Sequence, residues 1–169
     1  ALIQGCGVKT GLITTDGFRD LLEIGRQKRP DLYDLQIDKP ETLVSRDLRI
    51  GVQERMRNDG SIETLLDEEA FRNAVHTLKA LGVKSVAVCF LYSFLNPANE
   101  ELAARILAEE FPEAFAAISH RIAPEFREYE RLSTTVVNAS LRRLMQGYVP
   151  SLKKKITDLG IRVAPQLTQ

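Results

Sequence analysis

Residues 84–91 constrain the fold of this chain more than any other stretch. Most of their side chains are apolar, with Val86-Ala87-Val88-Cys89-Phe90-Leu91 in a row. Such a strand lacks the alternation of a sheet with one wet face and is typical of a parallel sheet covered by helices on both sides. An amphipathic segment ending at Gly82 precedes it, and Asn96-Pro97 opens another behind it. Alternating helices and buried strands predict an α/β fold.

Three further strands and a hairpin are predicted. Residues 9–15 and 114–119 are short apolar strands, and residues 48–53 alternate apolar and polar side chains as a half-buried strand does. Asn58-Asp59-Gly60 is a turn sequence that returns the chain through residues 62–64. We therefore expect a β-hairpin that continues directly from the strand at 48–53.

Helices are predicted between these strands. Thr15 or Asp16 caps a helix that buries Phe18, Leu21 and Leu22. Asp67 caps the next helix, whose buried face is Phe71, Val75, Leu78 and Leu81. Asn96-Pro97 starts another, which buries Leu102, Ala103 and Ile106.

A long helix follows the polar stretch 120–131. Its packed stripe is Tyr129, Leu132, Val136, Ser140, Leu144 and Tyr148. Helix interiors disfavour asparagine, so Asn138 predicts a buried hydrogen-bonding role. Pro150 is expected to break the helix, and a shorter helix then runs to Gly160.

Charge and cysteine content exclude several classes of protein. Lys plus Arg and Asp plus Glu both number 23, so there is no basic field for nucleic acid or anionic lipid. Neither an apolar run of roughly 18 residues nor a signal segment is present. Cys6 and Cys89 are far apart, and Cys89 is interpreted as a small buried hydrophobe. We therefore predict a cytoplasmic protein without nucleic-acid or membrane partners.

The first of two polar clusters follows the strand at 9–15. Thr14 and Thr15 lead through Gly17 to a helix start, where hydroxyls and free N–H groups favour an anion or polar ligand. Gly25 lets the backbone approach a ligand, and Arg26 offers a planar fork for a carboxylate, phosphate or imide carbonyl. The alternative is a capped helix followed by a solvated basic loop, which the spacing alone favours.

The second cluster spans residues 119–135. Glu125 and Glu128, with Arg127 and Arg131, are three and four residues apart and can share a helix face. They can orient a substrate or bind a metal, or form an ordinary surface ion-pair lattice, which the spacing alone favours. His120 is a candidate acid, base or ligand, although a histidine after a strand is more often structural. His76, within the amphipathic helix after Asp67, is interpreted as structural or exposed. No familiar metal or phosphate-loop motif is present, so metal ligands stay unassigned.

Several long motifs follow one another in a fixed order. They are residues 14–27 (TTDGFRDLLEIGRQ), Arg29-Pro30 with 32–35, Asp59-Gly60 with 66–69, 86–91 with 96–100, and 119–139. In this order they closely resemble the amino-terminal region of the hydantoinase A and 5-oxoprolinase family, over nearly the whole chain. The resemblance implies part of an ATP-dependent enzyme that opens a cyclic amide such as hydantoin, N-methylhydantoin or 5-oxoproline. The acetone carboxylase β subunit is a related branch.

The resemblance also implies a fold and a site. The fold is a lobe of an actin- and sugar-kinase-like (ribonuclease H-like) ATPase, with a mixed sheet flanked by helices and a β-hairpin. In the full-length protein, ATP and a divalent metal, Mg²⁺ or Mn²⁺, transfer a phosphoryl group to an amide or ketone oxygen. By motif position, the candidate catalytic residues are His120, Glu125 and Glu128. The candidate substrate contacts are Gly25, Arg26, Gln27 and Arg131, and the candidate cofactor contacts are Thr14 and Thr15.

The resemblance assigns residues 1–160 to the family's amino-terminal domain, truncated at its start, and 161–169 to the beginning of the following domain. The family's Asp-x-Gly-Gly-Thr-like phosphate signature is absent from this sequence. We therefore expect the chain alone to be inactive, with a cyclic amide, a carboxy-terminal lobe and a second subunit as partners.

Two other interpretations stay open. One is a structural assembly module of a multi-subunit enzyme, such as an acetone carboxylase β-like subunit. The other is a sugar or acyl kinase of the same superfamily, which should lack the motifs at 25–27 and 125–131. Convergence of the two polar clusters on one cleft would favour an enzyme site, and placement on opposite faces would favour the module.

Overall fold

The computed structural model describes residues 7–27, 33–34, 36 and 40–160. Within them, four strands form a sheet in the order β2-β1-β5-β6. Their bounds are Thr10–Thr15 for β1, Arg49–Val52 for β2, Ser85–Cys89 for β5 and Phe115–Ile118 for β6. All neighbouring strands are parallel, so the predicted mixed sheet is wrong for this part of the chain. Helical crossovers join the successive strands, and such connections produce parallel pairs.

The antiparallel pairing lies in a separate hairpin. Strands β3 (Arg55–Met56) and β4 (Ile62–Thr64) pair around a turn in which Gly60 has a φ of 82°. The predicted turn is confirmed, but the hairpin does not continue from β2. Between them the chain leaves the main sheet through Gln53 and Glu54, because the side chain of Glu54 is buried at the edge of that sheet.

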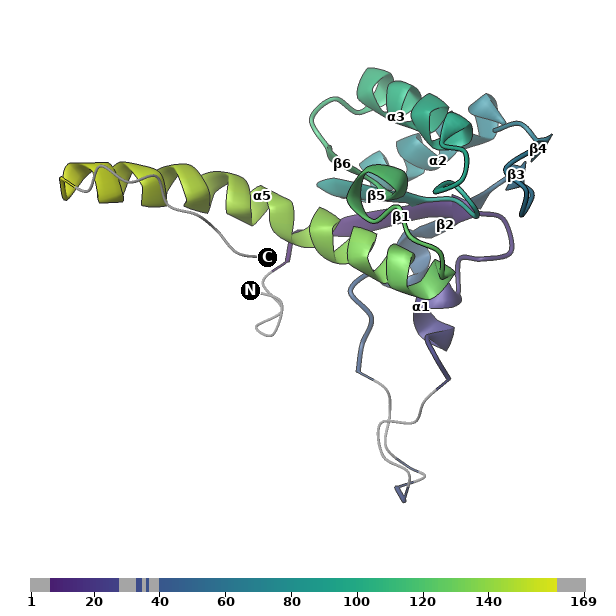
Figure 1. The fold of residues 1–169 in the computed structure, drawn as a ribbon, viewed down its shortest axis with the longest axis horizontal. Coiled ribbons are helices and arrows are strands. Elements are labelled where there is room, and N and C mark those ends of the chain that lie inside the picture. The colour runs from purple at the N-terminus through teal and green to yellow at the C-terminus, as the bar shows by residue number, and fades with distance from the viewer. Residues whose placement is uncertain (1–6, 28–32, 35, 37–39, 161–169) are drawn as a thin grey trace.

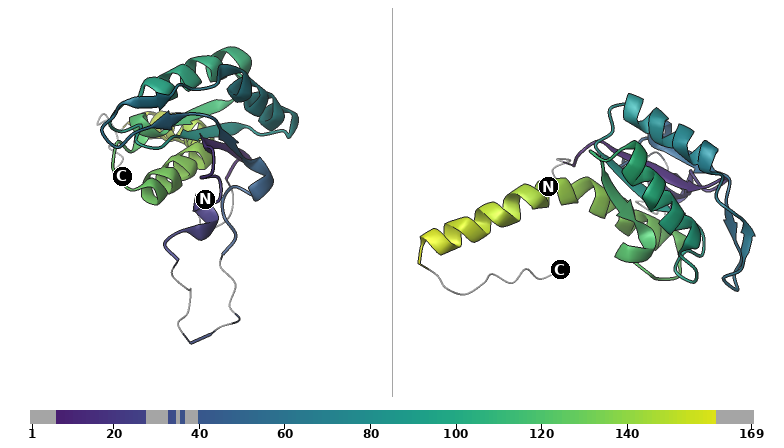
Figure 2. Two further views of the ribbon diagram at one scale, coloured as in Figure 1. Left: turned by 90° about the vertical axis from the view of Figure 1, so that its right-hand side faces the viewer. Right: turned by 90° about the horizontal axis from the view of Figure 1, so that it is seen from above.

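Helices cover both faces of the sheet (Figures 1 and 2). On one face lie α2 (Glu68–Ala80) and α3 (Ala98–Glu110). On the other face α5 (Glu128–Asp158) contacts the short helices α1 (Leu21–Ile24) and α4 (Ser119–Ile122). Because crossovers are right-handed, the direction in which a connection runs along the sheet decides the face on which its helix lies. The connections from β2 to β5 and from β5 to β6 cross the sheet in one direction, whereas that from β1 to β2 runs the opposite way.

The starts of α2 and α3 are confirmed. Asp67 accepts a hydrogen bond from the backbone N–H of Ala70 at 3.0 Å, and Asn96 accepts one from Ala98 at 3.1 Å. On these two helices, the following residues are buried as predicted: Phe71, Val75, Leu78, Ala103 and Ile106. Leu81 is an exception because it lies beyond the last turn of α2 and is exposed.

The helix after β1 is shorter than predicted. It begins at Leu21, and neither Thr15 nor Asp16 caps it. The backbone N–H of Asp16 instead donates to Val52, which prolongs the pairing of β1 with β2. Phe18 therefore lies in a turn before the helix, and only Leu21 and Leu22 pack against the core.

Helix α5 continues through Pro150, so the predicted break is wrong. A proline removes one backbone hydrogen bond and crowds the preceding turn, but here helical turns on both sides keep the segment in one helix. The first half packs on the sheet through Leu132, Val136 and Ala139. The second half projects away from the sheet (Figure 1), and Tyr148 is exposed.

Some predictions concern parts that the structure leaves undescribed. These are Cys6, Arg29-Pro30, the side chain of Leu144 and the beginning of the following domain at 161–169. Within the described ranges, no helix is long and apolar enough to cross a membrane.

Candidate functional site

The carboxyl ends of all four parallel strands meet at one edge of the sheet. Thr15 ends β1, Glu54 follows β2, residues 90–93 follow β5 and Ser119 follows β6. Polar side chains are buried at each of these positions. In open α/β sheets, ligands bind outside the carboxyl ends of the strands. This edge is therefore the candidate functional site.

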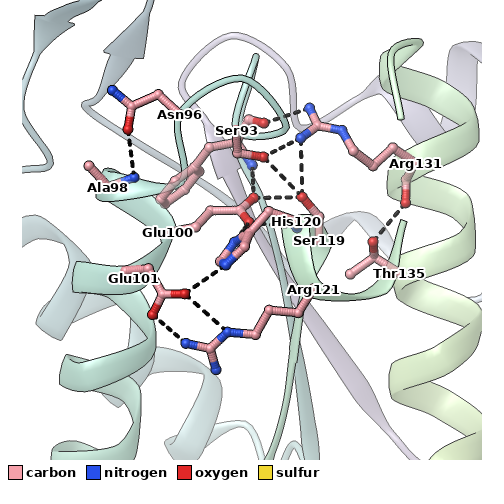
Figure 3. Close-up of polar contacts among 11 residues, drawn as sticks. Ser93, Asn96, Ala98, Glu100, Glu101, Ser119, His120, Arg121, Arg131 and Thr135 are labelled. Atoms are coloured by element: carbon pink, nitrogen blue, oxygen red, sulfur yellow. Dashed lines mark hydrogen bonds and ion pairs between the residues drawn. The ribbon is translucent and has the colours of Figure 1, made fainter. Parts of the chain in front are cut away.

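Glu100, in the first turn of α3, lies at the centre of the larger polar network (Figure 3). Its side chain is fully buried. Oε1 accepts hydrogen bonds from the backbone N–H of Phe90 at 2.8 Å and from Oγ of Ser119 at 2.6 Å. Oε2 accepts bonds from the backbone N–H of His120 at 2.9 Å and from its Nδ1 at 2.7 Å. One carboxylate thus joins the ends of β5 and β6 to the start of α3.

His120 lies between two carboxylates. Its Nδ1 faces Glu100, and its Nε2 lies 2.7 Å from Oε1 of Glu101. Because ionised carboxylates only accept hydrogen bonds, both ring nitrogens must carry protons. The hydrogen bond to Glu100 accordingly raises the pKa of His120, with a further contribution from Glu101. In this arrangement neither ring nitrogen is free to act as a base.

Arg131 points into the protein. Its Nη2 donates to the carbonyl oxygen of Phe90 at 2.6 Å, and its Nη1 donates to Oγ of Ser93 and, at 3.2 Å, to Oγ of Ser119. The hydroxyl of Ser119 in turn donates to Glu100. The guanidinium and the buried carboxylate are therefore linked through the hydroxyl of Ser119. Arg131 ties α5 to the loops after β5 and β6, and does not present its charged group to solvent.

A second buried carboxylate, Glu54, lies at the ends of β1 and β2. Thr15 donates its hydroxyl hydrogen to Oε1, and Nδ2 of Asn99 donates to Oε2 at 2.9 Å. Burial raises the pKa of Glu54, although these hydrogen bonds oppose the rise. Thr14 donates to the carbonyl oxygen of Cys89 at 2.7 Å. Both predicted cofactor contacts, Thr14 and Thr15, thus use their hydroxyls inside the protein.

The first polar cluster contacts the second at the start of α5. Nε of Arg26 donates to Oε1 of Glu130 at 2.7 Å. Gly25 has a φ of 55°, and a Cβ atom there would lie 3.7 Å from the ring of Tyr129. About half of the Arg26 side chain is exposed, so its guanidinium is open to a ligand. The two clusters are thus joined by an ion pair between Arg26 and Glu130, and a contact of this kind is not by itself the shared cleft that would favour an enzyme site.

Strained backbone surrounds these contacts. Among the described residues, the non-glycine residues with positive φ are Gln27 at 56°, Tyr92 at 53° and Arg127 at 79°. Gln27 follows Arg26, Tyr92 precedes Ser93, and Arg127 precedes α5. Such conformations are unfavourable and are concentrated at functional sites.

The predicted ion-pair lattice over 125–131 takes a different form. Glu125 is exposed in the loop before α5, and Glu128 is the half-buried first residue of that helix. Arg131 is directed inward, and the pair to Arg26 is made by Glu130, which the sequence analysis did not select. Helical spacing alone could not separate these acidic residues, because several of them share the first turns of α5.

The other sequence candidates are structural. Burial raises the pKa of Cys89 to about 12, so its thiol is a buried hydrophobe as predicted. His76 is exposed and lies 2.9 Å from Glu110. Oδ1 of Asn138 is buried without a hydrogen-bond partner, so the predicted role of that oxygen is not found. In the part of the chain that the structure describes, no three His, Cys, Asp or Glu side chains are grouped to hold a metal ion.

Comparison with known proteins places this chain in a family. Residues 1–111 match the family described as the hydantoinase/oxoprolinase N-terminal region. The chain belongs to the hydantoinase/oxoprolinase family. It is 38% identical to caprolactamase subunit alpha of Pseudomonas jessenii over 95% of this chain, and 34% identical to the acetophenone carboxylase gamma subunit of Aromatoleum aromaticum over 94%.

The solved structure of a relative has the same fold as this chain. The ATP-dependent caprolactamase of Pseudomonas jessenii superposes on all of this chain with a TM-score of 0.88 and 37% identity. That structure extends well beyond the match, since this chain covers 24% of it. The chain likewise covers 23% of caprolactamase subunit alpha and 24% of the acetophenone carboxylase subunit.

The sequence analysis did not select the residues at the centre of the site, Glu54 and Glu100. A signal for Glu100 was present, because Glu100 and Glu101 lie in the first turn of the helix that follows the fully buried strand β5. Acidic residues in a first helical turn are, however, common for electrostatic reasons alone. Glu54 follows a short strand with no motif around it, and only the tertiary structure reveals its burial.

Proposed function

We propose that this chain is the amino-terminal part of an ATP-dependent enzyme that hydrolyses a cyclic amide. The observation that carries the proposal is the contact between the two polar clusters, in which Arg26 binds Glu130, the residue next to Arg131 of the Glu100 network. The names of the relatives support it, since caprolactam is a cyclic amide. Hydantoin, N-methylhydantoin and 5-oxoproline are the candidate substrates, together with a lactam of the caprolactam type.

Arg26 is the proposed substrate contact. Its half-exposed guanidinium can donate to a ring carbonyl oxygen and stabilise negative charge that develops there. Gln27 offers one amide that can both donate to and accept from a cyclic amide, which itself presents C=O and N–H groups. Gly25 allows the backbone to approach the ring.

The remaining candidates are proposed to act around that contact. Glu125 and Glu128 lie before and at the start of α5, where a carboxylate can orient water or move a proton. His120 and Arg131 are held inside the Glu100 network, and we assign them the positioning of neighbouring loops. Thr14 and Thr15 position the edges of β1 and β5.

ATP and a divalent cation, Mg²⁺ or Mn²⁺, are part of this proposal. When bound, they would supply the phosphoryl group that activates the amide oxygen. The predicted contacts do not fit a nucleotide, because the hydroxyls of Thr14 and Thr15 are buried and bonded within the protein. We therefore assign nucleotide binding to parts of a longer protein that lie outside this chain. In this proposal, that protein is as long as the relatives, has the actin- and sugar-kinase-like ATPase fold, and is cytoplasmic.

The second candidate function is an assembly module of a multi-subunit enzyme. The observation that favours it is the projecting half of α5, where Met145 and Tyr148 are exposed, as is Leu159 directly after the helix. Two relatives are named as subunits, one of them of a carboxylase. In this proposal, α5 contacts a second subunit or the carboxy-terminal lobe, and the substrate is a ketone such as acetone.

Substrate-stimulated ATP hydrolysis by the full-length protein tests both candidates. The substrates are hydantoin, N-methylhydantoin, 5-oxoproline, caprolactam and acetone, each with and without the partner subunit. Stimulation by a cyclic amide supports the first function, and stimulation by acetone alone supports the second. If none of the five stimulates hydrolysis, the first function fails and the assembly role is favoured.

Arg26→Ala should lower kcat/KM for the stimulating cyclic amide by at least about tenfold, or roughly 1.4 kcal/mol of transition-state stabilisation. The reason is the loss of the half-exposed guanidinium of Arg26. Arg57→Ala is the matched control, because Arg57 also pairs with a glutamate at the surface, on the hairpin. Equal kinetics for Arg26→Ala and wild type would remove Arg26 from the site.

A further inference from the structure

We infer that Glu100 is a positioning residue of this site, which holds His120 as an imidazolium and balances the buried charge of Arg131 through Ser119. The inference rests on the proposed function for its effect on turnover. Its structural part, the control of His120 by Glu100, stands on the geometry alone. None of the relatives' names points to this residue.

Glu100 is ionised despite complete burial. Burial by itself would raise the pKa of its carboxyl group. Hydrogen bonds from His120 and Ser119, and from the backbone N–H groups of Phe90 and His120, outweigh burial and hold the pKa below its usual range. All of these groups can donate, and hydrogen bonds to the charged form favour that form.

The charges around His120 can be named element by element. Glu100 and Glu101 face it from α3, and Arg121 on its own helix donates to Glu101. Arg131 on α5 reaches the carboxylate of Glu100 through Ser119 (Figure 3). The carboxylates of Glu100 and Glu101 therefore balance three cationic side chains, which are His120, Arg121 and Arg131. Removing the charge of Glu100 takes away the carboxylate that Arg131 reaches through Ser119, and weakening the compensation of a buried charge is costly.

The network connects directly to the proposed substrate contact. Arg131 follows Glu130 in α5, and Glu130 binds Arg26. The anchoring of Arg131 at Phe90, Ser93 and Ser119 thus sets where the first turn of α5 lies relative to the sheet. Small displacements of positioning groups reduce turnover strongly. Loss of Glu100 should therefore act on the rate through the position of α5.

Glu100→Gln in the full-length protein is the test, with Glu101→Gln as a second variant at the other ring nitrogen. The matched control is Glu110→Gln, because Glu110 also contacts a histidine, His76, but at the surface. The readouts are kcat and KM against pH, and the titration of His120 followed by NMR with labelled histidine. The His120 resonance is assigned by its loss in His120→Asn.

Glu100→Gln should lower kcat at least about tenfold while KM changes less, since Glu100 itself is too buried to touch substrate. The pKa of His120 should fall, because its main stabilising partner is gone. Activity that requires the imidazolium is lost as pH rises through this pKa, so the alkaline limb of the kcat profile should move to lower pH. Glu101→Gln should lower the pKa of His120 and shift the alkaline limb of the kcat profile in the same direction, but by less. Glu110→Gln should change neither the pKa of His120 nor the kcat profile.

The inference is overturned if the titration of His120 in Glu100→Gln is the same as in wild type. It is also overturned if the variant has the wild-type dependence of kcat on pH. If Glu100→Gln does not fold, the same two outcomes in Glu101→Gln decide it. If the wild-type protein acts on no cyclic amide, the proposed function fails. The NMR titration then still decides the structural part, so the two failures are distinguishable.

Discussion

At the scale of single residues, two buried carboxylates at one sheet edge differ in how their charge is compensated. Glu100 receives four hydrogen bonds and has His120 beside it. Glu54 receives bonds from Thr15 and Asn99, both neutral. Because burial raises the pKa of Glu54, the folded state binds its proton more tightly than the unfolded state does. Glu54 therefore favours folding most at low pH.

Glu54→Gln should remove this pH dependence. The stabilisation by the raised pKa is fully present below the unfolded value, 4.5, and is lost as pH rises through the folded pKa. The Tm of wild type relative to the variant should accordingly fall as pH increases from 4 towards 8. Thermal unfolding at several pH values measures it, with Glu63→Gln on the exposed hairpin strand as control. A constant difference in Tm would show that Glu54 does not titrate as described.

At the scale of elements, close packing of helices on the sheet sets which residues are tolerated. Gly11 in β1 faces α2, and a Cβ atom there would lie 2.7 Å from a methyl group of Leu78. Gly147 in the projecting half of α5 has nothing within 4 Å of such an atom. The same substitution should thus have opposite effects on these two elements.

Gly11→Ala should destabilise the protein by about 1–3 kcal/mol, because Leu78 is fully buried and must shift. Gly147→Ala should stabilise α5 by up to about 1 kcal/mol, because alanine favours a helix interior over glycine. Chemical denaturation of the two variants checks both signs. Equal effects would contradict the described packing of β1 under α2.

The whole molecule consists of a sheet covered by helices on both faces and a long helix of which half projects away. The packed half of α5 belongs to the core through Leu132. Leu132→Ala should cost about 2–5 kcal/mol of unfolding free energy. Leu152→Ala in the projecting half, where the side chain is half exposed, should cost less than about 1 kcal/mol. Similar losses for both would mean that the projecting half is buried in solution.

The sequence by itself determined the α/β class, the order of the elements and the family, because these depend on local patterns. Neighbouring residues in the sequence are enough to predict the buried strand β5, the caps of α2 and α3, and the turn at Gly60. Pro150 is the main local signal that misled, since one lost hydrogen bond did not end a helix with turns on both sides.

Only the tertiary structure decided which polar side chains point inward. Arg131 and Glu130 are adjacent in sequence, yet one is buried against Phe90 and the other meets Arg26, which is 104 positions away. Glu100 and His120 likewise meet only because β5 and β6 are parallel neighbours whose carboxyl ends share an edge. Helical periodicity reports the direction of a side chain around its own axis. It carries no information on the partner that a crossover connection places opposite.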